Sequence, residues 1–515
     1  MKEKNTSMVD EVSLERRESP NVSHEPAPDA LLDKAGIFLT EREGVYGEID
    51  EADEKKIVRK IDWILLPMLF LTATLGAVDK VSLSTAAIYG FIEDNQLVGQ
   101  QYSWLGSIIF IGSLVGMWPM SFLFQKFRLG LVLATASLTW SAFTFLLCAG
   151  HNFAGFATLR FLMGFVECAI VPGCTLMVTR FYIKREQGPR LAYVFAFASS
   201  IINGFLSWLI GHFGSEIPKW KYLYIMVGSI STTWSLFLFY YLPDTPMNAK
   251  FLNDREKYFL IKKVLKNQTG IETKDWKLEQ MFEALLEPKS YIIMIFNIGI
   301  NIPNGGLNTF SSIIINNLGF SAMESSLMSM PTGLVATLAT IGFTYITTKF
   351  PNRRCLVCVI SLLIPLVGAV ILYTVDRSKV GPQLFGLYLL YFYFAPYVIM
   401  MSLAQANTAG NTKKSLVYSI NYLGYAAGAL IGPQTFRSNQ APRYTGGFTA
   451  MIAAYCVCIL LSLLYWFICV LNNRNKRAVL KSNQNCEVQI VATAKEADEL
   501  YDLTDKQQIT FFYTT

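Results

Sequence analysis

Long apolar runs alternate with short polar segments along most of the chain. A bilayer core about 30 Å thick is crossed by about 20 apolar residues in a helix, and the first run of this length begins near residue 61. The pattern predicts an all-α membrane protein of twelve membrane-spanning helices, and the even number places both chain ends on one side. These helices are predicted at 61–88, 103–124, 130–149, 153–178, 191–212, 222–242, 290–315, 324–348, 354–374, 382–405, 415–436 and 447–471.

The polar segments between the runs indicate an orientation and a division into halves. Lys and Arg gather on the side of the chain ends, and such basic loops stay in the cytosol. A Lys-Phe pair follows the second span, at Lys126, and the eighth, at Lys349, which indicates two parallel six-helix repeats of the major facilitator kind. We therefore expect a disordered cytosolic tail at 1–58, halves at 59–243 and 289–472, a central cytosolic loop at 244–288 and a cytosolic tail at 473–515.

Composition agrees with a chain embedded in the lipid bilayer. The chain is 52% hydrophobic and 16% charged, with a mean hydropathy of +0.35, which is more apolar than a soluble chain of this length needs. Its net charge of +6 is spread over short clusters, so we expect no nucleic-acid partner. Cys355 and Cys358 form a C-x-x-C without a second pair nearby, and helix packing is favoured over a metal or redox site. No metal or cofactor is expected.

Two charged residues lie inside the fourth predicted span. Arg160 and Glu167 are seven residues apart, which places them on one helix face about 10 Å apart in height. Charges inside membrane helices are costly and usually functional. We interpret Arg160 as a substrate-binding charge and Glu167 as a proton-coupling group; structural charges that stabilise the helix bundle are the alternative.

The first span carries a second charged pair, Asp79 and Lys80. Neighbouring residues on a helix point about 100° apart, so one of them is expected to face Arg160 or Glu167 while the other faces the transport pathway. We assign Asp79 to proton coupling and Lys80 to substrate binding. An ion pair at the membrane interface is the alternative.

A stripe of amides runs along the seventh span, where Asn297, Asn301, Asn304 and Asn308 follow one another at spacings of four, three and four. Such a stripe must face protein or water, and amides donate to a carboxylate without carrying charge. The first three are predicted to bind substrate, with hydrogen bonding between helices as the alternative.

Further features of the spans are weaker indications. Pro303 and the two glycines that follow it at 305 and 306 predict a break in the seventh helix, which would free backbone groups for a ligand. Gln405, Asn421 and Tyr425 are polar positions in the tenth and eleventh spans. We add them to the substrate-binding candidates, although each alone is more typical of packing.

Several stretches together resemble the fungal allantoate permease family, in the anion:cation symporter branch of the major facilitator superfamily. They include YSWLGSIIFIGSLVGMWP, HNFAGFATLRFLMGFVECAIVPG, LPDTPMNAKFLNDREKY, NIPNGGLNTF and NTAGNTKKSLVYSINYLGYAAGALIGPQTFRSNQAPRY, within about residues 55–475. The resemblance implies proton-driven import of a small organic anion such as allantoate, ureidosuccinate, a vitamin acid or a sulfonate. It also implies that the acidic-basic pair Asp79–Lys80 and the pair Arg160 and Glu167 serve proton coupling and anion binding.

One stretch departs from the superfamily pattern. The loop after the second span reads SFLFQKFRLG, without the Asp of the usual G-x-x-x-D-R-x-G-R-R, so the usual cytosolic gating salt bridge is not expected. We predict a monomeric transporter of the plasma membrane, with an internal membrane as the alternative location. A nutrient sensor on the same fold is the alternative function, and an enzyme is not expected because no nucleophile with a positioned base is visible.

Overall fold

The computed structural model describes residues 38–39, 42, 46, 51–195, 199–214, 217–267, 277–482, 503–508 and 511–515. The chain divides into two units, 1–48 and 49–515, and the second unit contains every element discussed below. Its described residues form helices, turns and loops without a strand. Most of the tail expected at 1–58 lies outside the described residues.

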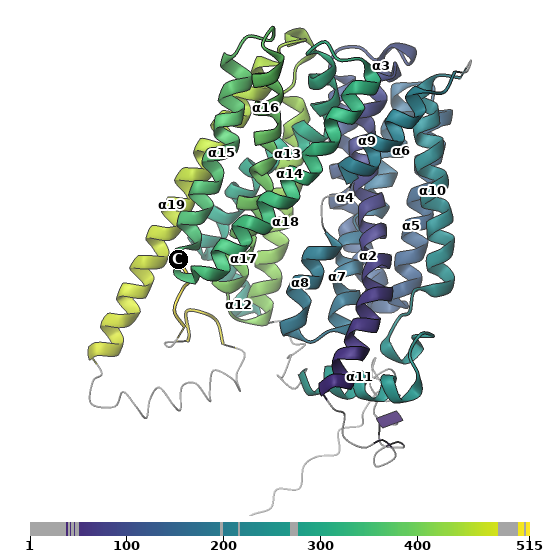
Figure 1. The fold of residues 1–515 in the computed structure, drawn as a ribbon. Helices are drawn as coiled ribbons and strands as arrows, with labels where there is room; N and C mark the ends of the chain where they lie inside the picture. The colour runs from purple at the N-terminus through teal and green to yellow at the C-terminus, as the bar shows by residue number, and fades with distance from the viewer. Residues whose placement is uncertain are drawn as a thin grey trace, which may run out of the picture. The chain divides into compact units, whose positions relative to one another are not determined.

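The first half contains six predicted spans, and the fourth and fifth are each built from two consecutive helices (Figure 1). Helix α3 (Phe91–Asp94) is a short turn after the first span. The helices of the spans are α2 (Glu51–Ile88), α4 (Gln101–Lys126), α5 (Leu129–Leu146), α6 (Phe153–Glu167) with α7 (Ile170–Phe181), α8 (Lys184–Val194) with α9 (Ser199–Gly211), and α10 (Lys219–Tyr241).

The second half repeats this plan, and its fourth span is again divided. Its helices are α13 (Pro288–Asn316), α14 (Ala322–Lys349), α15 (Arg354–Thr374), α16 (Val380–Leu390) with α17 (Phe394–Ala406), α18 (Asn411–Gln434) and α19 (Thr445–Ser482). Two short helices, α11 (Asp254–Asn267) and α12 (Leu278–Leu286), lie in the sequence between the halves.

Ten of the spans in the described residues are long and apolar enough to cross a membrane. The other two predicted spans form α13 and α18, which have 29 and 24 residues but carry polar side chains along their length. These two helices pack extensively on each other. The predicted all-α membrane fold is confirmed.

Two boundaries differ from the expected ones because charged helix formers extend the helices beyond the apolar runs. Helix α2 begins at Glu51, so residues 51–58, which we assigned to a disordered tail, are helical. Its first turn is acidic, which is favourable beside the helix N-terminus. Helix α19 likewise continues to Ser482, ten residues past the predicted end of the half at 472.

Helices α4 and α6 approach closely, and this contact fixes the position of Arg160. A Cβ at Gly164 would lie 1.9 Å from the carbonyl oxygen of Ile109, so only glycine allows the observed distance between the two backbones. Small residues at such contacts are typical of membrane helices, because close packing takes the place of the hydrophobic effect there.

Hydrogen bonds between the halves gather toward one end of the helices. Tyr102 donates to the carbonyl oxygen of Thr309 at 2.6 Å, and Ser107 donates to the carbonyl oxygen of Leu430 at 2.8 Å. Both bonds lie toward the end where α4 begins and α18 ends, opposite to Lys126. The halves are therefore joined at the end opposite to the basic loops.

Candidate functional site

The charged residues of the first half meet between α2 and α6. The Lys80 ammonium lies 2.8 Å from Oε1 of Glu167, and the Lys80 side chain keeps 24% of its surface exposed while Glu167 keeps 5%. The two residues come from predicted spans one and four. Lys80 therefore neutralises Glu167 and still reaches accessible space.

Asp79 and Arg160 form the other part of this charged group. Oδ2 of Asp79 accepts a hydrogen bond of 2.6 Å from Thr144 on α5, and the Asp79 carboxylate interacts electrostatically with Arg160. Both residues are buried, with 1% and 2% of their surface exposed. Of the two adjacent residues on α2, Lys80 thus pairs with Glu167, and Asp79 interacts with Arg160.

Several polar atoms of this group have no hydrogen-bond partner among the described residues. They are Nε and Nη1 of Arg160, Oδ1 of Asp79 and Oε2 of Glu167. A buried polar group without a partner costs about 1–3 kcal/mol, and more when it is charged. Unsatisfied donors on a guanidinium are suited to an anion, because hydrogen bonds from a charged donor to a carboxylate are about twice as strong as neutral ones.

The amides of α13 form a hydrogen-bonded ladder, which consists of Asn297, Asn301, Asn304 and Asn308. Nδ2 of Asn304 donates to Oδ1 of Asn301 at 3.0 Å, and Nδ2 of Asn308 donates to Oδ1 of Asn304 at 2.9 Å. Asn297 donates to Asn421 of α18 at 3.1 Å, while its own Oδ1 has no partner among the described residues. The ladder therefore bonds to α18 through the Asn297 amide nitrogen, and the Asn297 amide oxygen remains as a free acceptor among the described residues.

The expected break in α13 is wrong, since the helix continues through Pro303 from Pro288 to Asn316. The glycines serve close packing instead. A Cβ at Gly305 would lie 2.2 Å from the carbonyl oxygen of Ala429 on α18. Neighbouring helices commonly accommodate proline within a membrane helix in this way.

The other second-half candidates fall into two groups. Asn421 is 3% exposed and bonds to the ladder, and Tyr425 packs edge-on against Phe110 of the first half, with ring centroids 6.1 Å apart. Gln405 is exposed one residue before the end of α17. It lies on the outward face of α17, outside the buried ladder, while its neighbours Leu403 and Ala404 are buried.

Sequence reasoning named Tyr425 but missed two other tyrosines around these residues, Tyr393 and Tyr422. Tyr393 donates to Oδ1 of Asn304 at 2.8 Å, and the Tyr422 ring centroid lies 5.7 Å from that of Tyr425. Tyr422 and Tyr425 both interact electrostatically with Lys80. The signal was present in the sequence as tyrosines far inside spans, because membrane tyrosines usually collect at the interfaces.

Two helical halves, one with buried and incompletely satisfied charges and the other with a buried ladder of amides, are typical of a multi-pass membrane transporter. The chain belongs to the Major Facilitator Superfamily, whose family model matches residues 68–433. This confirms the fold predicted from the sequence. The family and the similar fungal proteins are transporters, so the expectation that the chain is no enzyme is also confirmed.

Similar proteins agree with the family resemblance read from the sequence. The MFS-type transporter cnsL of Penicillium expansum is 37% identical over 463 residues, which cover 90% of this chain and 88% of that protein. The allantoate permease of Saccharomyces cerevisiae is 28% identical over 538 residues, covering 99% and 97%. The crystal structure of a D-xylose-proton symporter has a TM-score of 0.57 at 15% identity, covering 78% of this chain and 97% of that one. The predicted likeness to the fungal allantoate permease family is confirmed.

Proposed function

We propose that the protein is a proton-coupled symporter that imports a small organic anion by alternating access. The observation that carries this proposal is the buried guanidinium of Arg160, which has two nitrogens without a partner among the described residues and interacts with Asp79, the neighbour of the Lys80 that pairs with Glu167. An anion with a carboxylate or sulfonate group supplies the missing acceptors. The likeness to the yeast allantoate permease supports the same substrate class.

The proposed coupling rests on the pair of Lys80 and Glu167. A proton on Glu167 removes its negative charge, which leaves the positive charge of Lys80 available to the anion. When the proton leaves, Glu167 competes again for Lys80 and weakens anion binding. Proton and anion therefore bind best together, which is the thermodynamic requirement for symport.

Co-transport of a proton also solves an energetic problem of anion import. Moving one negative charge into a cell with an inside-negative potential costs about 2.3 kcal/mol per 100 mV. One proton that moves with a monovalent anion makes the step electroneutral. The amides Asn297, Asn301 and Asn304, with Asn421 and Tyr425, are proposed to select among anions by shape, since neutral groups discriminate by geometry.

In the proposed transport cycle, the structure corresponds to the state in which the substrate site is open to the cytosol. The halves are hydrogen bonded at the end opposite to Lys126, and we place the basic end in the cytosol by the distribution of Lys and Arg. The proposed unit is a monomer in the plasma membrane, with halves at 59–243 and 289–472 joined by the loop 244–288.

Uptake into cells that lack their own anion permeases tests the proposal. A panel of labelled carboxylates, sulfonates and neutral compounds of similar size is offered at acidic external pH, with and without an uncoupler. Accumulation of at least one anion, abolished by the uncoupler, is expected. Accumulation that the uncoupler leaves unchanged contradicts proton coupling, and accumulation of neutral compounds in place of anions contradicts the substrate class.

A further inference from the structure

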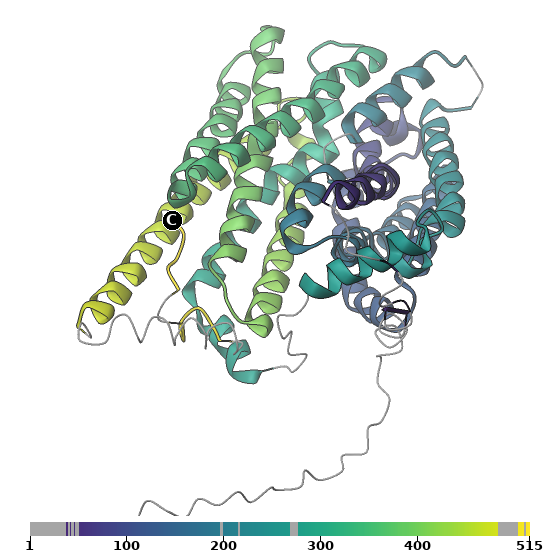
Figure 2. The ribbon, with the colours of Figure 1, turned by 60° about the horizontal axis from the view of Figure 1, so that its bottom comes forward.

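The segment 503–515, here named the tail segment and described at 503–508 and 511–515, lies against the helix ends of the second half on the side of α12 (Figure 2). Its anchor is Asp505, whose surface is fully buried. The Asp505 carboxylate lies 2.5 Å from Nζ of Lys413 and 3.1 Å from Nζ of Lys289. Tyr513 donates to the same carboxylate at 2.7 Å.

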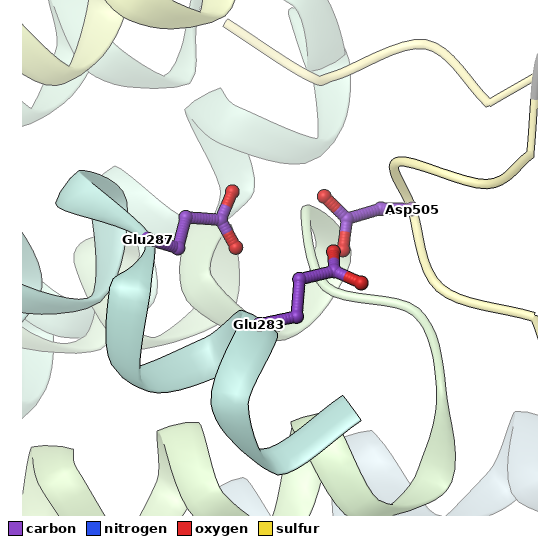
Figure 3. A group of neighbouring side chains, drawn as sticks. All are labelled: Glu283, Glu287 and Asp505. Atoms are coloured by element: carbon purple, nitrogen blue, oxygen red, sulfur yellow. The ribbon is translucent and has the colours of Figure 1, made fainter. Parts of the chain in front are cut away.

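Two further carboxylates converge on Asp505, those of Glu283 on α12 and Glu287 at the start of α13 (Figure 3). Such a trio has the oxygen ligands of a cation site. Here ammonium groups already supply the positive charge, because Nζ of Lys413 lies 2.8 Å from Glu283 and 2.6 Å from Glu287. We therefore read the cluster as an ion-pair network that is completed by the tail segment.

A third lysine binds the tail segment through its backbone. Nζ of Lys476, on α19, donates to the carbonyl oxygens of Asp505 at 2.5 Å and of Gln508 at 2.8 Å. Lys289 and Lys413 face the three carboxylates of the cluster, whereas Lys476 satisfies backbone carbonyls of the tail segment. Buried charges are tolerated when they are paired, and Asp505 of the tail segment supplies a partner for both Lys289 and Lys413.

Two asparagines recognise the backbone of the tail segment. Asn407 accepts a hydrogen bond from the Thr514 amide at 2.7 Å and donates to the Thr514 carbonyl at 2.9 Å. Asn473 makes the same pair of bonds with Tyr513, both at 2.8 Å. An amide side chain that satisfies the donor and the acceptor of one residue acts like a neighbouring strand. The surface is thus equipped to bind an extended peptide.

We propose that these helix ends form a peptide-binding site whose ligand is the tail segment, and that docking clamps the connection between α17 and α18. Asn407 follows the last residue of α17 and Lys413 lies in the first turn of α18, so the tail segment holds both sides of this connection. Alternating access requires helix ends on this side to change neighbours. A docked tail segment makes the second half move as one unit. The inference does not depend on which substrate is carried.

The clamp is electrostatic and insensitive to physiological pH. Burial raises the pKa of the Asp505 carboxyl, but Lys289 and Lys413 outweigh burial and lower that pKa to about 2. A carboxylate with a lowered pKa stabilises the docked state above its unfolded pKa of about 3.9, and this stabilisation is lost only as the pH falls toward 2. A change of charge on the tail segment would release it, whereas a change of cellular pH would not.

Hydrogen–deuterium exchange of the purified full-length chain tests the clamp. Asp505→Asn keeps the size of the side chain and removes its charge, and Lys506→Gln is the matched control because Lys506 is the exposed neighbour in the same turn. We expect Asp505→Asn to speed exchange of the 407–414 and 511–515 amides at least about tenfold, the effect of losing one charged hydrogen bond. The control should leave exchange unchanged. Equal exchange in wild type and Asp505→Asn overturns the proposal.

A gentler variant covers the case in which Asp505→Asn fails to reach the membrane. Tyr513→Phe removes a single hydroxyl, and it should speed exchange in the same two regions by a smaller factor. Where both single variants are stable, their combination should have no more effect than Asp505→Asn alone, because the hydroxyl acts through that carboxylate. Unchanged exchange in Tyr513→Phe, or fully additive effects, contradicts the assigned contacts.

Discussion

Replacing Arg160 by lysine tests whether substrate binding needs the guanidinium group or only a positive charge at this position. The guanidinium is 2% exposed, and its Nε and Nη1 have no partner among the described residues, so it keeps donors for a substrate anion. Lysine keeps the charge and presents one ammonium in place of the planar fork. The variant should therefore lose one charge-assisted hydrogen bond to the substrate, worth about 1.5–3 kcal/mol.

That loss corresponds to a weakening of substrate binding by about 10- to 150-fold. The assay is the concentration dependence of initial uptake, together with the amount of protein at the membrane. Arg180→Lys is the matched control, since Arg180 lies in the last turn of α7 and donates to the carbonyl oxygen of Asp244 at 3.1 Å. Equal half-saturation of Arg160→Lys and wild type would show that Arg160 is a structural charge.

Other predictions address coupling, selectivity and topology. Glu167→Gln should abolish uphill accumulation and its dependence on external acidity while exchange of substrate across the membrane survives; retained proton-driven accumulation would leave Asp79 as the proton carrier. Asn301→Ala and Asn304→Ala should change the ranking of competing anions in uptake competition, and an equal loss for all anions would assign the ladder to packing. A protease site placed in the 244–288 loop should be protected in intact cells and cut after permeabilisation, and cleavage in intact cells would reverse the proposed orientation.

Some features of the fold could be predicted because they depend only on local composition. The apolar run that ends at Ile88 predicted the end of α2 correctly. The start of α2 and the end of α19 were not predicted correctly. The charged residues beyond each apolar run also favour a helix, so the helices are longer than the runs. The break expected at Pro303 was wrong because its effect depends on the helix packed beside it.

For the candidate site, the sequence determined which residues are unusual, and the tertiary structure decided their partners. The sequence alone shows that Arg160, Glu167 and the asparagines lie inside apolar runs. Polar groups in such runs are costly in lipid, so they are usually functional. The tertiary structure decides which helices are neighbours and at what height. It therefore decides that Lys80 pairs with Glu167, that Asn297 donates to Asn421 and that Asp505 contacts two lysines. Those relations arise from packing between segments distant in the chain, and a linear pattern of hydrophobic and polar residues does not contain them.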